Sequence, residues 1–149
     1  MGQKQVAKFT LEVNSKRVLP GAERNEVSAA GEGRVAGIAA FIVFTHTGQP
    51  LPDGSEIATG DGFLRAKDGC AVAFLQGIGG FRCQQNETPA PRQAWQGAVA
   101  VKSESSTFRK LNGRVFWLEV YLDLDGNSVH RWFALDLCDD DEEEGDFDF

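Results

Sequence analysis

Residues 115–124 read VFWLEVYLDL, and this stretch carries the clearest structural signal in the chain. Its even-numbered positions are all apolar, whereas its odd-numbered positions include two acids. Two unlike sets of alternating residues are typical of a β-strand, because successive side chains point to opposite faces. The turn-forming residues 125–127 follow, and residues 128–137 predict a second strand. The C-terminal part of the folded chain is therefore expected to be antiparallel β-structure.

The same alternation, or a short apolar run, predicts further strands toward the N-terminus. These strands cover residues 7–13, 33–45, 57–66, 70–76 and 95–102, and the strand described above lies in an extended segment over residues 108–123. Residues 15–27 are mostly polar and contain Pro20-Gly21, so we expect a loop there. No window of the sequence shows a helical period, which indicates an all-β protein.

The spacing of these strands predicts how they are arranged. About eight strands joined mostly by short turns predict an antiparallel meander, whose simplest closed form is a single eight-stranded barrel of calycin or lipocalin size. A two-sheet sandwich is the alternative. Glycines inside the predicted strands favour the barrel, because closure needs sharp coiling that side chains obstruct. They lie at positions 33, 37, 60, 62, 77, 79 and 97.

The composition indicates one domain with a charged extension. The chain has 149 residues, of which 42% are hydrophobic and 25% charged, as in a single globular domain. Its net charge of −7 is concentrated in residues 139–149, which carry eight acids and no base. The remaining residues are close to neutral overall. We therefore expect a barrel domain over residues 1–138 and a disordered acidic tail over residues 139–149.

The three cysteines and two histidines show no spacing typical of a metal site or a disulfide framework. The first residues lack the features of a signal peptide, and no apolar run reaches the ~18 residues of a membrane span. We expect no metal, no cofactor and no membrane association, and a cytoplasmic location.

Six short motifs occur in an order that resembles a known family. They are Gly31-Glu32-Gly33-Arg34-Val35-Ala36-Gly37, Pro52-Asp53-Gly54, Gly60-Asp61-Gly62, Lys67-Asp68-Gly69, Gly77-Ile78-Gly79 and Leu111-Asn112-Gly113. The family consists of small, mostly uncharacterised prokaryotic proteins with a barrel like that of allene oxide cyclase. Its pattern usually has Glu where this chain has Cys70. The resemblance spans residues 31–132 and implies an allene oxide cyclase-like barrel with an internal ligand cavity.

Enzymes of similar architecture suggest what such a cavity does. Allene oxide cyclase and dirigent proteins hold a reactive intermediate in the barrel and bias its cyclisation or coupling. The resemblance therefore implies a small apolar ligand, while the catalytic motifs of those enzymes have no match in this chain.

Glu119 is the first candidate for catalysis. It lies between Trp117 and Tyr121 on one face of its strand. If this face lines a cavity, loss of water raises the carboxyl pKa and makes Glu119 a general acid or base, with the two aromatic residues binding the ligand. The alternative places Glu119 in water. The entirely apolar opposite face favours this alternative, because such a face normally points into the core.

His46 and His130 are the only histidines and are candidates for proton transfer. His46 shares its strand face with Phe44, and His130 shares its face with Trp132, which makes both aromatic residues candidates for ligand binding. A structural or surface role is the alternative for each histidine.

These features favour a barrel that binds a small apolar ligand, with an isomerase or cyclase acting by cavity shape as its enzymatic form. A second hypothesis is a single-stranded nucleic-acid-binding or protein interaction module, whose acidic tail ending in Phe149 is regulatory and binds a basic partner. The near-neutral barrel domain makes nucleic acid the second choice, because such affinity depends largely on phosphate contacts. A third hypothesis is a homo-oligomeric structural barrel without a ligand.

Overall fold

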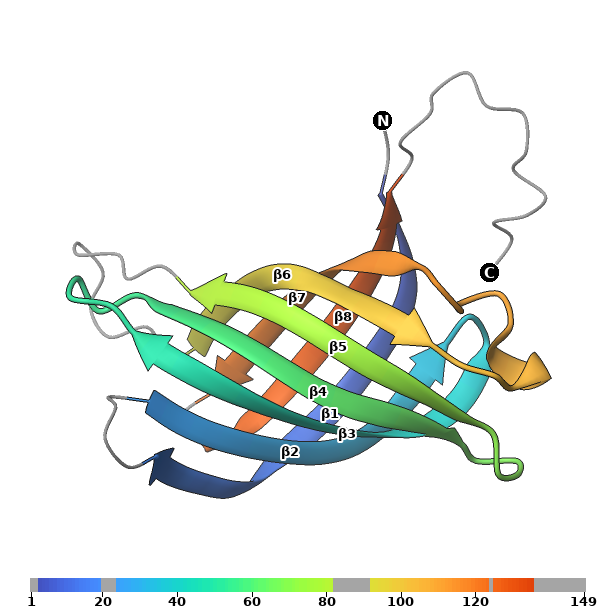
Figure 1. Cartoon of the computed structure of the whole chain (residues 1–149), viewed down its shortest axis with the longest axis horizontal. Coiled ribbons are helices and arrows are strands. Elements are labelled where there is room, and N and C mark those ends of the chain that lie inside the picture. The colour runs from blue at the N-terminus through green and yellow to red at the C-terminus, as the bar shows by residue number, and fades with distance from the viewer. Residues whose placement is uncertain (1–2, 20–23, 82–91, 124, 136–149) are drawn as a thin grey trace.

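The computed structural model describes residues 3–19, 24–81, 92–123 and 125–135, which form one sheet that closes on itself (Figure 1). Its strands are β1 (Gln3–Leu19), β2 (Arg24–Val35), β3 (Ile38–Pro50), β4 (Glu56–Ala66), β5 (Val72–Phe81), β6 (Arg92–Lys102), β7 (Val115–Asp123) and β8 (Asn127–Leu135). Each strand pairs antiparallel with its neighbours in the chain, and β1 also pairs with β8. The prediction of a single eight-stranded antiparallel barrel is confirmed, and the sandwich is excluded.

Glycines allow neighbouring strands to approach closely where the sheet coils. A Cβ atom at Gly33 would lie 2.0 Å from the carbonyl oxygen of Lys8, and one at Gly97 would lie 2.0 Å from that of Ile78. No side chain fits at such distances. A larger residue at position 33 would push β2 away from β1, and one at position 97 would push β6 away from β5. The prediction that glycines inside strands serve barrel closure agrees with these contacts.

The region predicted as one strand over residues 33–45 is instead a hairpin. Ala36 and Gly37 form its turn, with φ angles of 50° and 79°. Two successive residues with positive φ are typical of the two-residue turn that matches the twist of paired strands. The sequence pattern failed here because Ala-Gly is not among the usual turn pairs.

The loop predicted over residues 15–27 is wrong for most of its length. β1 continues to Leu19, and β2 begins at Arg24, where the two strands still pair. A register shift between Val13 and Ser15 interrupts the alternation of apolar and polar residues. An irregularity of this kind hides a strand from a period-two search.

A short helix covers one end of the barrel. Residues 108–114, predicted as extended, belong instead to the end of this 3-10 helix, η1 (Ser106–Phe108), and the turn after it. Figure 1 shows η1 at the right-hand end of the barrel, opposite the turn between β3 and β4. Phe108 and Leu111 are completely buried and belong to the main core. The helix therefore closes this end with apolar side chains.

Several expectations concern residues outside the described ranges. They concern the acidic tail of residues 139–149 with its partners, and two of the three cysteines, Cys83 and Cys138. Cys70 is exposed and is a free thiol. Within the described ranges, no helix is long and apolar enough to cross a membrane.

Phe108→Ala tests the importance of the covered end. We expect a loss of about 3–5 kcal/mol in the free energy of unfolding, because the change leaves a cavity in a packed core. Urea denaturation followed by tryptophan fluorescence measures it. Thr107→Ala, at the exposed neighbouring position, is the control and should cost no more than about 0.5 kcal/mol. Equal effects of the two substitutions would contradict the role of Phe108.

Candidate functional site

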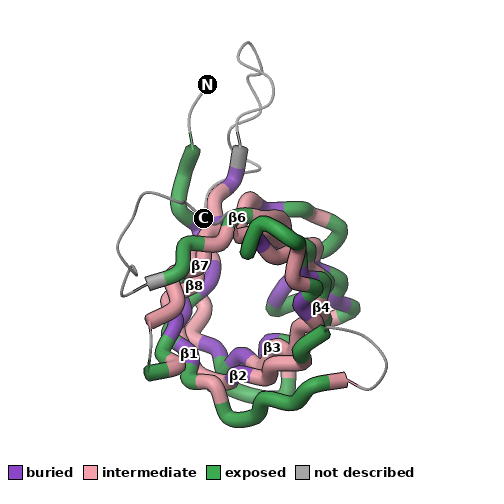
Figure 2. The backbone as a smooth tube through the Cα atoms, turned by 90° about the vertical axis from the view of Figure 1, so that its left-hand side faces the viewer, coloured by how far each residue is buried: buried purple, intermediate pink, exposed green. Residues whose placement is uncertain are grey.

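The interior of the barrel is packed in one half and hollow in the other. In the packed half, the Trp132 ring lies 5.6 Å from Phe9 and 5.8 Å from Phe116 between ring centroids, and all three residues are buried. The other half contains a cavity of about 600 Å³ whose wall includes residues of every strand. Figure 2 views the ring of strands nearly end on. None of the three aromatic residues of the packed half lines the cavity.

Small residues keep this half hollow. The cavity wall contains Ala29, Ala58, Gly60, Gly77, Gly79 and Ser128. Phe44 also lines the cavity, but its ring lies close against the wall: a Cβ at Gly60 would lie 2.6 Å from it, and one at Gly77 would lie 3.2 Å from it. Where glycine lines the barrel, a large aromatic residue can therefore pack sideways and leave the centre open.

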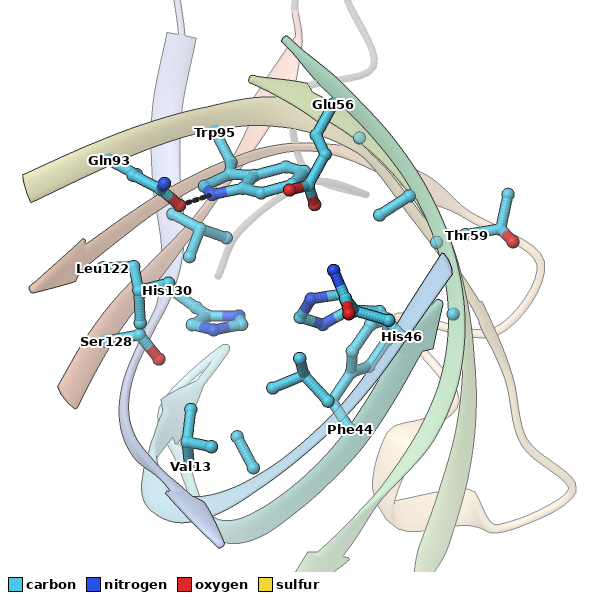
Figure 3. A pocket seen from close by; sticks show the side chains of 18 of the residues that line it. Val13, Phe44, His46, Glu56, Thr59, Gln93, Trp95, Leu122, Ser128 and His130 are labelled. Atoms are coloured by element: carbon cyan, nitrogen blue, oxygen red, sulfur yellow. Dashed lines mark hydrogen bonds between the residues drawn. The ribbon is translucent and has the colours of Figure 1, made fainter. Parts of the chain in front are cut away.

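Two imidazoles are exposed to this cavity from opposite parts of the barrel. His46 lies on β3 and His130 on β8, and Figure 3 shows both rings directed into the same space. Burial lowers the pKa of His46. Burial and the nearby His46 lower the pKa of His130 from 6.5 to about 4. Both histidines are therefore neutral near pH 7.

The hydrogen bonds of the described residues include none to either imidazole ring. Every completely buried side-chain nitrogen or oxygen in that part of the chain has a hydrogen-bond partner. The histidine ring nitrogens have none, so they are not completely buried and are open to the cavity. A neutral imidazole offers one N–H donor and one nitrogen acceptor. The site therefore presents free hydrogen-bonding groups within mostly apolar walls.

Trp95 contributes the largest aromatic surface of the cavity. Its ring centroid lies 6.0 Å from that of His46 and 5.8 Å from that of Phe81. The indole N–H donates to the side-chain oxygen of Gln93 at 3.4 Å (Figure 3). Trp95 therefore lies in the cavity wall beside both His46 and Phe81, where a ligand can stack on it.

Charged side chains also line the cavity. Lys16 and Arg17 come from the far end of β1, and Arg17 pairs with Glu26 at 2.9 Å. Glu56 comes from the start of β4, and burial raises the pKa of its carboxyl group. Because these residues lie at strand ends, the charges mark the mouth of the cavity.

Only some of the predicted site residues lie at this cavity. His46, His130 and Phe44 line it, as we expected. Trp132 does not, because it is buried in the packed half with Phe9 and Phe116. The prediction that Trp132 binds the ligand is therefore wrong in position.

Glu119, Trp117 and Tyr121 lie on the outside of the barrel, so the hypothesis that their face forms a cavity wall, with Glu119 as a catalytic residue, is wrong. Their strand neighbours Leu118 and Val120 line the cavity, so the odd-numbered positions point outward. Glu119 is paired in register with Arg131, and the Arg131 guanidinium lies 5.8 Å from the Tyr121 ring centroid. Tyr121 borders a separate cavity of about 510 Å³. The alternative stated from the sequence, an apolar face directed into the core, is the correct one.

Trp95 and Glu56 line the cavity but were not among the residues predicted from the sequence. Trp95 shares its strand face with Gly97 and Val99, and Val99 is buried. Glu56 precedes the small inward residues Ala58 and Gly60. Both could have been found by treating small residues at alternate positions as a sign of a hollow interior.

No group of three or more His, Cys, Asp or Glu residues in the described ranges is arranged to hold a metal ion. The chemistry that the cavity offers is hydrogen bonding, proton transfer by imidazole and enclosure of an apolar molecule.

Comparisons with known proteins concern the fold. No protein-family model and no curated protein matches the sequence. A protein of unknown function from Clostridium acetobutylicum is similar in structure, with a TM-score of 0.75 and 12% identity, covering 89% of this chain and 97% of that one. A conserved protein of unknown function from Rhodopseudomonas palustris has a TM-score of 0.72 and 14% identity, with 89% and 97% covered. A β-barrel-like protein from Acinetobacter baumannii has a TM-score of 0.74 and 15% identity, with 91% and 96% covered.

At such identities the likeness establishes the fold alone. The chain is structurally similar to bacterial β-barrel proteins of unknown function, and no sequence family is identified for it.

The low pKa of His130 predicts a pH-dependent stability. Between about pH 6.5 and 4 the unfolded chain binds a proton at this residue that the folded chain does not. Stability should therefore fall as the pH falls through this window, by about 3 kcal/mol from this residue. In His130→Phe that part of the loss should disappear. Urea denaturation at pH 7 and pH 4 compares the two proteins, and an identical loss in both would contradict the low pKa.

Proposed function

We propose that this protein binds a small, mostly apolar molecule in the hollow half of its barrel. The observation that carries the proposal is the cavity of about 600 Å³ with residues of all eight strands in its wall. Volumes of roughly 300–1,000 Å³ with apolar walls and a few polar groups are typical of ligand sites. One half of the interior is packed, while small residues keep the other half open. This contrast supports a ligand as the occupant of the open half.

The enzymatic form of this proposal is an isomerase or cyclase. The order of turn and glycine motifs resembles the family with an allene oxide cyclase-like barrel, and allene oxide cyclase and dirigent proteins guide a reactive intermediate by enclosing it. In this protein the wall would orient the substrate, and His46 and His130 are the groups able to move a proton. Glu119 has no part in the proposal, because its neighbours Leu118 and Val120 are the residues that line the cavity.

Filling the cavity tests the proposal directly. Ala58 is buried in the wall, and in register it lies between Gly48 and Gly79, neither of which has a side chain. Ala58→Phe should therefore place its ring in the cavity. We expect the affinity for phenylnaphthylamine, an uncharged apolar dye, to fall about tenfold or more, because overpacking costs roughly 1–3 kcal/mol. Dye fluorescence measures the affinity.

The matched control is Ile57→Phe, at the residue that precedes Ala58. Ile57 is 50% exposed and points outward, so its substitution should leave dye affinity unchanged. Circular dichroism and thermal unfolding confirm that both variants fold. Equal affinity of Ala58→Phe and the wild type, or no dye binding by the wild type and by a wider panel of apolar compounds, would contradict the proposal.

Trp95 should report ligand binding. The other two tryptophans lie outside the cavity wall, Trp132 in the packed core and Trp117 on the outer face. An apolar ligand should therefore change the emission of the wild type and of Trp117→Phe, but not that of Trp95→Phe. Loss of the change in Trp117→Phe instead would place the ligand on the outside of the barrel.

A further inference from the structure

The two histidines of the cavity set the chemistry of its occupant. They lie on β3 and β8, strands that are not neighbours in the barrel, yet Figure 3 shows their rings on opposite sides of one space. A single polar group placed between them can reach both. The wall around them includes the apolar residues Phe44, Leu118 and Val120, together with the hydroxyl of Ser128 on the same strand as His130.

Burial leaves both rings neutral near pH 7, and few charged side chains line the same cavity. The charged side chains that line the cavity are Lys16 and Arg17 from β1 and Glu56 from β4, all near strand ends. The described lining residues of β2, β5, β6 and β7 include no acid or base, and the only titratable lining residues of β3 and β8 are the two histidines. Burial disfavours the protonated form of each imidazole. The pair therefore offers N–H donors and nitrogen acceptors without a net charge.

Three kinds of occupant can be compared on this basis. A hydrocarbon would displace water and leave the ring nitrogens without hydrogen bonds, which is unfavourable. A charged group would lose its hydration with no opposite charge between the histidines. An uncharged oxygen accepts a hydrogen bond from an imidazole N–H, and a hydroxyl group also donates to a ring nitrogen. An uncharged oxygen is therefore the group that satisfies the hydrogen-bonding capacity of both imidazoles.

We propose that His46 and His130 bind an uncharged oxygen, a hydroxyl or ketone, on an otherwise apolar ligand. This inference rests on the proposed function, since it names the ligand of the same cavity. The apolar body of the ligand fills the space beside Phe44 and Val120 and contacts the Trp95 ring, whose centroid lies 6.0 Å from that of His46. The histidines therefore decide which apolar molecules are retained.

A series of compounds of equal chain length tests the inference. Decane, decanol, a decanone, decanoate and decylamine are compared at pH 7 by displacement of phenylnaphthylamine. Decanol and decanone should bind roughly threefold to tenfold more tightly than decane for each hydrogen bond gained. Decanoate and decylamine should bind less tightly than decanol, because each would bury a charge.

Substitution of the histidines should remove this preference. In the double variant His46→Phe and His130→Phe the rings are kept without their nitrogens, so decane should bind at least as tightly as decanol. Tyr121→Phe is the control: it removes a polar group from the outer face and should leave the preference unchanged. Persistence of the preference in the double variant would overturn the inference.

The wild-type protein gives a second measurement that needs no substitution. It has two histidines in all, so their ring signals in NMR spectra can be assigned with the single variants His46→Phe and His130→Phe. Decanol should shift the imidazole nitrogen signals of both residues, and decane should shift them much less. Equal shifts would overturn the inference.

The outcomes separate the two proposals. If decane and decanol bind equally, the cavity is a ligand site but the histidines do not select an oxygen. If decanoate binds most tightly, the selected group is an anion, and this inference is wrong. If no member of the series and no other apolar compound binds, the proposed function fails and the inference fails with it.

Discussion

Closure of the sheet between β1 and β8 is the constraint on which the rest of the molecule depends. A closed barrel has no free edge, and each strand then has one face inside and one face outside. Closure needs strong coiling, and the close contacts at Gly33 and Gly97 show where glycine permits it. Once the ring is closed, the size of each inward side chain decides whether the interior at that level is filled or open.

The size of the inward side chains divides the interior into two halves with different properties. Phe9, Phe116 and Trp132 fill one half, and η1 covers its end. The other half carries residues such as Ala58 and Gly77 at equivalent inward positions. The packed half supplies the buried apolar surface that stabilises the fold, which lets the open half remain unfilled. The binding proposal depends on this division.

Burial also determines the chemical character of the open half. Burial lowers the pKa of His46 and His130, because it disfavours their protonated forms. The same exclusion of water makes the walls favourable for an apolar ligand. Their nitrogens are open to the cavity and have no hydrogen-bond partner in the described part of the chain. A site that attracts an apolar molecule therefore also offers it two neutral polar contacts, and the two inferences follow from one physical cause.

The alternation of residues 115–124, the turn signals and the glycines within strands were sufficient to predict an eight-stranded antiparallel barrel. They also showed that His46 shares a strand face with Phe44, and both residues line the cavity in the structure. Alternation shows which residues share a face, but it does not say which face points inward. For this reason the sequence left open whether Glu119, Trp117 and Tyr121 line a cavity, and the structure places them outside.

The sequence also did not predict at which level along the barrel axis each inward side chain lies. Trp132 and His130 share one face of β8, yet Trp132 lies in the packed half and His130 at the cavity. That difference arises from the stagger of eight strands, which sets the level at which each residue meets its neighbours across the interior. The sequence by itself indicated the fold class and most of the strands, because alternation and turn signals are local. Only the tertiary structure decided which side chains meet inside the barrel, because those contacts join residues far apart in the chain.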